Sequence, residues 1–570
     1  MPWNQPVSRR EILRYGSALG FGAVGASLFA ACTPLEEGSS PPRHLALPKP
    51  KPAKYLAVVI VDACRADYLR YGHLPTIGSL INGGTYFPNA FSGIMESTTP
   101  ACHASLGTGC FPKNDGGILG FWWEDPESGQ SVDSVNLNDP SSATEAYEPQ
   151  SLELIVKQSK APTMAGLLKS VDPTAKIYTS SGVKFYAADA VGGPDADYIT
   201  YFWNDGPSTY RPLSVPGHEI PADILADPDL TRSDWYTMTT DSPGMQDMLV
   251  VDLAIKLIKR ERPRIVVLNL PEMDWPVAHL YGGPLDGSAV TKLMENADTA
   301  MANLINAYRE MGIFHETVFC FMGDHGVLPL EHQVNPSAFA GAIARAGTSI
   351  QTYDYHTGAF FWLNDPSKAA NAAYEITALK EPGVSAVYFR GGSDGAPRYL
   401  PAEASASSLL PGVDSAYRYL LETMNGPNAP HIVALYQERT GTVGAGGNYP
   451  WKGDHGGASW ASQAVPVIMT GPGIRQGFRS PFPARLVDLT PTFLRLLGAP
   501  HPGMDGVVLA DALVDPLARE SRLQNLTSRQ IIPVVGALKR QSAADVREMG
   551  AYFTPPTQSK KSGIPLNPAY

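Results

Sequence analysis

The chain alternates between short apolar runs and amphipathic segments over most of its length. Residues 245–260 and 289–311 repeat apolar positions at three- and four-residue spacing, which predicts helices. Continuous apolar runs predict strands that are buried on both faces, at residues 55–61 (YLAVVIV), 264–270 (RIVVLNL), 317–322 (TVFCFM) and 465–470. This alternation is typical of an α/β fold with a mostly parallel central sheet and helices on both faces.

A different pattern interrupts this alternation between residues 335 and 450. It predicts strands at residues 360–363, 386–389 and 431–436, and helices at residues 367–377 and 414–424. We interpret residues 335–450 as a smaller α+β lobe inserted into a main domain that spans residues 55–515. Residues 201–241 lack a clear periodicity and are expected to form a cap or loop. Residues 516–570 are expected to be a C-terminal tail with helical pieces and a mobile end.

The first 54 residues are typical of a targeting segment and a tether. The stretch SRREILR, with Arg9 and Arg10, resembles a twin-arginine export signal, and the mildly apolar residues that follow are short for a membrane span. FAAC resembles a lipoprotein cleavage box, with Cys32 as the acylated residue; a plain signal peptide cut elsewhere is the alternative. We therefore predict a signal at residues 1–32, a Pro-rich tether at 33–54, and a lipid-anchored protein of the cell envelope on the outer side of the membrane.

Composition narrows the classes of partner. The chain is 44% hydrophobic and 17% charged, which is ordinary for a globular protein. Its formal net charge is −11, and the sequence has no basic stripe that could neutralise phosphates. A nucleic-acid polymer is therefore not expected as a partner, whereas small anions can bind if metal ions supply the local positive charge. The oligomeric state is left open.

Acidic and imidazole side chains follow the predicted strands. They are Asp62 after the first strand, Asp274 and His279 after the second, Asp324 and His325 after the third, and His455 ahead of the fourth. Because ligands of open α/β sheets bind beyond the carboxyl ends of the strands, we expect these side chains to converge. Carboxylate oxygen and imidazole nitrogen suit Zn²⁺, ahead of Mn²⁺ or another divalent metal.

The ligands divide into two predicted metal sites. Asp274, His279 and His455 form one; Asp62, Asp324 and His325 form the other, with Thr99 as an additional ligand. Thr98 and Thr99 lie just ahead of a helical segment, where free N–H groups and the helix dipole favour negative charge on a nucleophile. A threonine that merely caps the helix is the alternative. Two divalent ions would carry four positive charges against three carboxylates, and a threonine alkoxide would neutralise the remaining one.

Taken together, these residues resemble the alkaline phosphatase superfamily, in particular its type I phosphodiesterase/nucleotide pyrophosphatase and threonine-nucleophile alkaline phosphatase branch. The matching motifs keep the family's order over roughly residues 55–513: VVIVDACRADY, TTPACHASLGTG, MDWPVAHLYGGP, MGDHG, KGDHGG and VPVIMTGPGI. The resemblance implies two zinc ions, a phospho-threonine intermediate and hydrolysis of small phosphoric esters. The family's nucleophile lies four residues before a helix histidine, here His103, which selects Thr99; His103 itself is expected to pack the helix.

The sequence departs from the family at positions that contact phosphate. Phe121 stands where the family usually has an asparagine, and Tyr186 replaces the arginine of a Lys-x-Arg pair whose lysine is Lys184. We take these three residues as candidate substrate-binding residues; core aromatics and a solvated surface lysine are the alternatives. A dianionic monoester would have fewer polar partners, which favours phosphodiesters or nucleotide pyrophosphates. The spacing from Asp274 to His279 is one residue longer than in the family, so this loop must bulge.

The sequence leaves two alternative functions open, argues against a third and suggests one disulfide. A phosphomonoesterase of the same superfamily and a catalytically degenerate binding lipoprotein both remain as alternatives. A sulfatase requires a cysteine or serine at position 98 and an arginine at position 102, where this chain has Thr98 and Cys102. Because Asp62 and Thr99 should share one zinc ion, we hypothesise a Cys64–Cys102 disulfide, with two unpaired thiols as the alternative.

Overall fold

The computed structural model describes ten segments of the chain, all within the unit Pro50–Tyr570. They are residues 52–114, 122–124, 131–133, 161–204, 210–231, 246–282, 288–392, 397–402, 409–443 and 451–549. The predicted signal, most of the tether, and the candidate residues Cys32 and Phe121 lie outside these segments.

A nine-stranded sheet forms the centre of the described structure, in the order β20-β2-β19-β9-β1-β8-β5-β6-β7. Its strands are β1 (Tyr55–Val61), β2 (Thr85–Tyr86), β5 (Ile177–Ser180), β6 (Tyr198–Asn204), β7 (Tyr210–Ser214), β8 (Ile265–Leu270), β9 (Thr317–Gly323), β19 (Val467–Thr470) and β20 (Phe478–Arg479). The five neighbours β9, β1, β8, β5 and β6 run parallel. The predicted α/β class with a mostly parallel sheet is thus confirmed.

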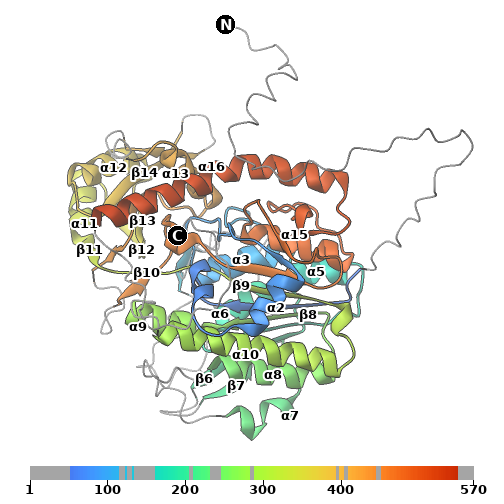
Figure 1. The fold of residues 1–570 in the computed structure, drawn as a ribbon. Helices are drawn as coiled ribbons and strands as arrows, with labels where there is room; N and C mark the ends of the chain where they lie inside the picture. Colours follow the sequence, from blue (N-terminus) through green and yellow to red (C-terminus); the bar gives the residue numbers. More distant parts are fainter. Residues whose placement is uncertain are drawn as a thin grey trace, which may run out of the picture. The chain divides into compact units, whose positions relative to one another are not determined.

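Helices cover both faces of this sheet because its inner strands are apolar on both sides. Alternate residues of β1 enter two separate hydrophobic cores, for example Val58 on one face and Val59 on the other. Burying one such side chain stabilises the fold by about 1.5–3 kcal/mol. The first core includes α3 (Thr99–Thr108), α5 (Met164–Lys169), α6 (Phe185–Gly192) and α15 (Leu486–Leu497), and the second includes α2 (Pro75–Gly83), α8 (Gln246–Glu261) and α10 (Ser288–Glu310), as Figure 1 shows.

A second, antiparallel sheet forms the inserted lobe, in the order β12-β13-β16-β14-β15. Its strands are β12 (Ile350–Tyr355), β13 (Gly358–Leu363), β14 (Val384–Gly391), β15 (Arg398–Pro401) and β16 (Ile432–Tyr436). Helices α11 (Pro336–Arg345) and α12 (Ala369–Ala378) pack on one face, and α13 (Val413–Thr423) packs on the other. The three strands and two helices predicted for this interval are present; β12, β15 and α11 were missed.

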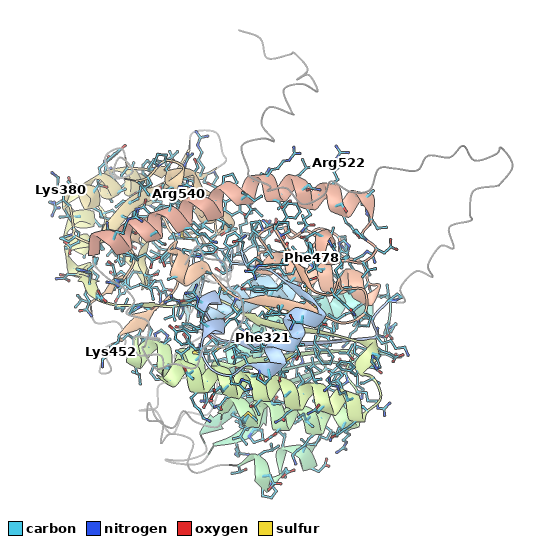
Figure 2. All side chains as sticks on the ribbon, in the orientation of Figure 1. Phe321, Lys380, Lys452, Phe478, Arg522 and Arg540 are labelled. Carbon is cyan, nitrogen blue, oxygen red and sulfur yellow. The ribbon has the colours of Figure 1, made fainter. Side chains whose placement is uncertain are left out.

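Most of the predicted tail that the structure describes is one helix, α16 (Ala518–Met549), which packs against α13 (Figure 1). Ile531, Val535 and Leu538 on α16 are buried in the lobe's core. Arg522, on its other side, points away from the protein, whereas Phe321 on β9 lies in the interior (Figure 2). None of the helices in the described segments has both the length and the apolar character needed to cross a membrane.

The loop predicted for residues 201–241 is wrong for much of its length. It contains the end of β6, all of β7, the short helix α7 (Ala222–Leu225) and the turn η4 (Pro228–Leu230). Strand β7 is paired only with β6, at the edge of the sheet, and it contains Pro212. An edge strand tolerates proline and needs no continuous apolar run, which explains why the pattern gave no sign of it.

Small two-stranded sheets connect the lobe and the central sheet. They pair β10 (Leu328–Pro329) with β18 (Gly453–Asp454) and β11 (His332–Val334) with β17 (Thr440–Thr442); β3 (Trp122–Glu124) pairs with β4 (Ser131–Asp133) elsewhere. The β10–β18 pair is antiparallel and joins Leu328 to Asp454. This pairing brings the segment that contains His455 back to the segment that follows β9.

Candidate active site

Four adjacent parallel strands deliver polar side chains to one edge of the central sheet. Strand β1 ends at Val61, which pairs with Gly323 of β9 on one side and with Leu270 of β8 on the other. The polar residues at this edge are Asp324 and His325 after β9, Asp62 after β1, Asn269 and Asp274 at and after the end of β8, and Lys184 after β5. The structure therefore brings together side chains that are far apart in sequence.

The hydroxyl of Thr99 points into this edge, whereas that of Thr98 does not. Helix α3 begins at Thr99, and Thr98 precedes it in an extended conformation without making a side-chain cap. Thr99 Oγ1 lies 3.3 Å from Asp62 Oδ1 and 3.2 Å from His325 Nε2. Thr98 Oγ1 is buried and has no hydrogen-bond partner in the part of the chain described. Of the two hydroxyls, Thr99 is the one beside the carboxylates.

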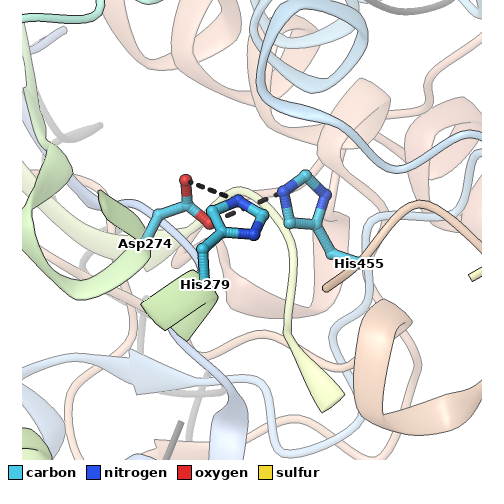
Figure 3. A group of neighbouring side chains, drawn as sticks. All are labelled: Asp274, His279 and His455. Atoms are coloured by element: carbon cyan, nitrogen blue, oxygen red, sulfur yellow. Dashed lines mark ion pairs between the residues drawn. The ribbon is translucent and has the colours of Figure 1, made fainter. Parts of the chain in front are cut away.

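The first predicted ligand group, Asp274, His279 and His455, is gathered in one place (Figure 3). His279 Nε2 lies 3.4 Å from Asp274 Oδ2, and His455 Nε2 lies 3.5 Å from Asp274 Oδ1. The five-residue step from Asp274 to His279 forms an irregular turn, η6 (Asp274–Ala278), which leads into α9 (His279–Tyr281). Trp275 inside this turn has φ −115° and ψ 115°, which is not helical; the bulge relative to the family stays a prediction.

The second predicted ligand group, Asp62, Asp324 and His325, is also gathered in one place. His325 Nε2 lies 3.5 Å from Asp62 Oδ1 and 3.4 Å from Asp324 Oδ2. Asp324 Oδ1 accepts hydrogen bonds from the backbone N–H groups of Ala63 (3.1 Å) and His325 (2.9 Å). These bonds turn the other oxygen of Asp324 toward the site.

The donor atoms of both groups fit a divalent cation. Each of the three histidines has its Nδ1 beside a backbone carbonyl, at 3.0 Å for His279, 3.0 Å for His325 and 3.2 Å for His455. An Nδ1–H donated to a carbonyl leaves the lone pair on Nε2, the usual arrangement of a metal-binding histidine. Asp274 Oδ1 and Asp324 Oδ2 are buried without hydrogen-bond partners among the described residues. Such orphaned carboxylate oxygens need a cation.

Lys184 is buried in the site, so the alternative of a solvated surface lysine is wrong. Its Nζ donates to Asp62 Oδ1 at 2.9 Å, to Thr99 Oγ1 at 3.1 Å and to Asp274 Oδ2 at 2.5 Å. Burial lowers the pKa of Lys184, but the carboxylates of Asp274 and Asp62 raise that pKa well above its ordinary value. Lys184 therefore places an ammonium group next to the Thr99 hydroxyl.

The part of the chain that contains most of these residues also matches a known protein family. Residues 56–382, more than half of the chain, match the model of the type I phosphodiesterase / nucleotide pyrophosphatase family. The chain belongs to this family. As a member of it, the protein is a phosphoric ester hydrolase of the alkaline phosphatase superfamily, whose members use divalent metals.

Individual relatives of this phosphodiesterase family member are distant in sequence. Alkaline phosphatase PhoK from Sphingomonas sp. is 23% identical over 522 residues, covering 79% of this chain and 89% of PhoK. Among solved structures, alkaline phosphatase PafA has a TM-score of 0.60 at 18% identity and covers 82% of this chain and 100% of its own. Murine ectonucleotide pyrophosphatase / phosphodiesterase 5 has a TM-score of 0.55 at 15% identity, covering 80% and 100%. These structures show the same fold.

Burial and neighbouring charges move the pKa values of the candidate ligands in opposite directions. Burial, with help from Asp62, raises the pKa of Asp324 to about 8. Burial also raises that of Asp274, but Lys184 and His279 outweigh this and hold the pKa well below its usual range. Burial lowers the pKa of His325. The histidine is thus kept neutral, which is the form that binds a metal.

Asn269 is a residue of this site that the sequence analysis missed. Its Nδ2 donates to Asp62 Oδ2 at 3.0 Å and lies 3.2 Å from His103 Nε2, and its Oδ1 accepts from Ser181 Oγ at 2.8 Å. The available signal was a single amide side chain inside the apolar run RIVVLNL. His103 lies behind the site as well, with Nδ1 2.8 Å from the Thr99 carbonyl.

Tyr186 lies on α6 two residues after Lys184 and is buried, 5% exposed. Its ring meets that of Phe185 edge-on, with centroids 5.4 Å apart, inside the first hydrophobic core. Burial raises the pKa of the Tyr186 hydroxyl, so it stays neutral. The place of the family's arginine is therefore taken by a neutral aromatic side chain.

The hypothesised Cys64–Cys102 disulfide is wrong. Both residues are free, buried thiols. Cys102 packs in the core on the α3 face of the sheet, whereas Cys64 belongs to the core on the other face, with its Sγ 3.8 Å from Met294 Sδ. Ala63, at φ 56°, turns the chain directly after Asp62. Sharing one edge of the sheet brings Asp62 and Thr99 together, but the chains then diverge to opposite faces.

Proposed function

We propose that this protein hydrolyses phosphodiesters or nucleotide pyrophosphates with Thr99 as the nucleophile and two zinc ions as cofactors. The observation that carries the proposal is the position of Thr99 Oγ1, which lies 3.3 Å from Asp62, 3.2 Å from His325 and 3.1 Å from Lys184. The ammonium group of Lys184 and the helix N-terminus both favour negative charge on this oxygen, and Asp62 and His325 are metal-ligand candidates beside it.

The two ligand groups would each hold one zinc ion. Asp274, His279 and His455 supply one set of donors, and Asp62, Asp324 and His325 supply the other, to which Thr99 adds its hydroxyl. When bound, the ions lower the pKa of the threonine hydroxyl and neutralise charge on the phosphoryl group. Carboxylate and imidazole donors support Zn²⁺ ahead of Mn²⁺.

The residues around Thr99 account for the two halves of the reaction. The Thr99 alkoxide attacks phosphorus, its bond to phosphorus forms, and the bond to the leaving-group oxygen breaks, so that a phospho-threonine remains and the leaving group departs as an anion. Water then attacks the same phosphorus, the proton that water loses passes through solvent to the leaving group, and Thr99 departs as an alkoxide that Lys184 stabilises by donating its N–H. Asn269 holds Asp62 in place through both steps.

Charge balance favours a singly charged substrate. Two divalent ions and Lys184 bring five positive charges, and Asp62, Asp274 and Asp324 bring three negative ones. A threonine alkoxide and one diester charge offset the remaining two. A dianionic monoester would leave one negative charge uncompensated in a buried site, where unpaired charge is costly. Tyr186, in place of the family's arginine, supplies no further positive charge.

Replacement of the nucleophile tests the proposal directly. Thr99→Ala should abolish ester hydrolysis yet keep both zinc ions, because each ion retains three other ligands. Activity would be followed with bis-p-nitrophenyl phosphate, and zinc content by elemental analysis of the same preparation. Thr98→Ala is the matched control and should stay active. An inactive Thr98→Ala beside an active Thr99→Ala would show that the nucleophile is the other threonine.

A phosphomonoesterase of the same superfamily is the second candidate. It is favoured by the similarity to the alkaline phosphatases PhoK and PafA and by the cationic Lys184 beside Thr99. The ratio of kcat/KM for bis-p-nitrophenyl phosphate to that for p-nitrophenyl phosphate separates the two. We expect the diester to be preferred. A clear preference for the monoester would mean that Lys184, or a cation from elsewhere in the chain, holds the second negative charge.

We also propose that the protein is exported by the twin-arginine route and anchored by a lipid on Cys32, where it meets small phosphoesters outside the membrane. Support comes from SRREILR and FAAC alone. Mass spectrometry of the mature N-terminus should find a diacylglyceryl-modified cysteine at position 32. An unmodified N-terminus at another residue would instead indicate a plain signal peptide.

A further inference from the structure

A third group of metal-ligating side chains lies outside the two catalytic groups and shares no residue with them. Glu96, Asp354 and His356 each place a ligand atom within 4.8 Å of the others. Glu96 lies in the loop that leads to Thr99, three residues before it. Asp354 is on strand β12 of the lobe, and His356 follows that strand. The group therefore spans the junction between the nucleophile loop and the lobe.

Glu96 is the member of this group whose carboxylate lacks a hydrogen-bond donor. It is 2% exposed, and neither of its carboxylate oxygens meets an N–H or hydroxyl donor among the described residues. Burial, the charge of Asp354 and a side-chain hydrogen bond with Asp354 raise the pKa of Glu96 well above its usual range. A buried carboxylate without a donor is costly, so Glu96 must either keep a proton or meet a cation, and the ligand atoms of Asp354 and His356 lie beside it.

His356 lies between two carboxylates: burial lowers its pKa, but Asp354 and Asp454 raise that pKa to about 9, so a bound metal would replace a proton on this ring. Its Nδ1 lies 3.4 Å from Asp454 Oδ1, and its Nε2 lies 3.3 Å from Asp354 Oδ1. A carboxylate on one ring nitrogen fixes the ring and increases the basicity of the other nitrogen. Asp454 would play this supporting part, and Nε2 would face Asp354 and Glu96.

We propose that Glu96, Asp354 and His356 bind a third divalent cation, Zn²⁺ or Mn²⁺. Two carboxylates and one imidazole form a mixed oxygen and nitrogen donor set that suits these two metals, whereas Mg²⁺ and Ca²⁺ prefer oxygen alone. The cation would offset the negative charge that Glu96, Asp354 and Asp454 concentrate around one imidazole. It takes no part in the chemistry at Thr99.

The third cation would hold the lobe against the catalytic loops. Asp454 directly precedes the ligand His455, whose carbonyl accepts a hydrogen bond from the N–H of Thr357 at 3.1 Å. Gly456 has φ +87°, and a Cβ there would lie 3.0 Å from His356 Cβ and 3.3 Å from Thr98 Cγ2. These loops are in close contact, so a cation that joins Glu96 to the lobe would position the loop that carries Thr99.

Metal counting on purified protein tests the proposal. The full chain would be equilibrated with Zn²⁺ or with Mn²⁺ alone and desalted, and the bound ions per chain measured by elemental analysis. We expect three ions in the wild type and two in Glu96→Gln, with the affinity for the third ion at least about 100-fold weaker in the variant. His356→Gln and Asp354→Asn should behave alike. Glu375→Gln, which changes an exposed carboxylate of the same lobe, should keep three.

An anomalous-scattering map of wild-type crystals grown with Zn²⁺ provides a second measurement that does not require a variant to fold. A peak among Glu96, Asp354 and His356 supports the proposal. The absence of a peak there in the wild type would overturn the proposal. Equal ion counts in the wild type and all three variants would also overturn it, and would mean that Glu96 and Asp354 share a proton instead. The difference in bound ions per chain between the wild type and Glu96→Gln does not depend on whether the two catalytic groups hold zinc. Failure of the proposed function would therefore be seen separately.

Discussion

Replacing Asn269 with alanine should weaken zinc binding at one catalytic group and leave the other intact. Asn269 does not face the substrate; it acts by holding Asp62. Its amide donates to Asp62 Oδ2 at 3.0 Å, and its side-chain oxygen accepts from Ser181 at 2.8 Å, so its orientation is set from both ends. Asn269→Ala removes the only donor described for that oxygen of Asp62.

The size of the effect follows from the charge of the acceptor. A hydrogen bond to a charged group contributes about 1.5–3 kcal/mol, which corresponds to roughly 10- to 150-fold in binding at 1.36 kcal/mol per decade. The zinc ion proposed for Asp62, Asp324 and His325 should therefore bind about 10- to 150-fold more weakly, and kcat/KM at limiting zinc should fall to match. The ion held by Asp274, His279 and His455 should bind as before.

Competition with a chromogenic chelator would measure the two zinc affinities, and thermal unfolding would show that the variant is folded. Ser181→Ala is the matched control, because it removes a bond to Asn269 but leaves the amide on Asp62; its zinc affinity should stay within a few-fold of wild type. A folded Asn269→Ala protein with both zinc affinities and kcat/KM unchanged would refute the positioning role.

Further predictions concern metal binding and pH. His325→Ala should lose one zinc ion and most activity, because the Nε2 of His325 belongs to the second ligand group. His103→Ala should mainly lower the melting temperature. A folded His103→Ala protein without metal would contradict this ranking. Burial raises the pKa of Asp189, whose carboxylate oxygens have no hydrogen-bond partner in the described segments. The folded protein therefore retains a proton on Asp189 that the unfolded chain releases above about pH 4. As the pH rises from there to the pKa of Asp189 in the folded protein, the free energy of unfolding should fall by about 1.4 kcal/mol per pH unit. Asp189→Asn should flatten this slope in melting curves from pH 5 to 8, and equal slopes would contradict the assignment.

Much of the central architecture could be predicted from the order of residues alone. A strand buried on both faces requires an unbroken apolar run, and the runs that became β1, β8 and β9 are of this kind. Ligands gather at the carboxyl ends of parallel strands, so the placement of Asp62 and Asp324 could be read from position. The extra residue between Asp274 and His279 likewise predicted an irregular loop, and the chain is kinked at Trp275 there. The edge strand β7 gave no such signal because only one side of it is paired.

Only the tertiary structure decided which side chains share an environment. Lys184 has the same local sequence whether it is solvated or buried, and its place between Asp62 and Asp274 depends on β5 lying next to β8. Cys64 and Cys102 start from neighbouring points but enter cores on opposite faces of the sheet. Glu96 and His356 meet because the lobe folds back on the nucleophile loop. Sequence pattern determines which segments are buried; strand order and the face on which each crossover packs determine which buried groups meet.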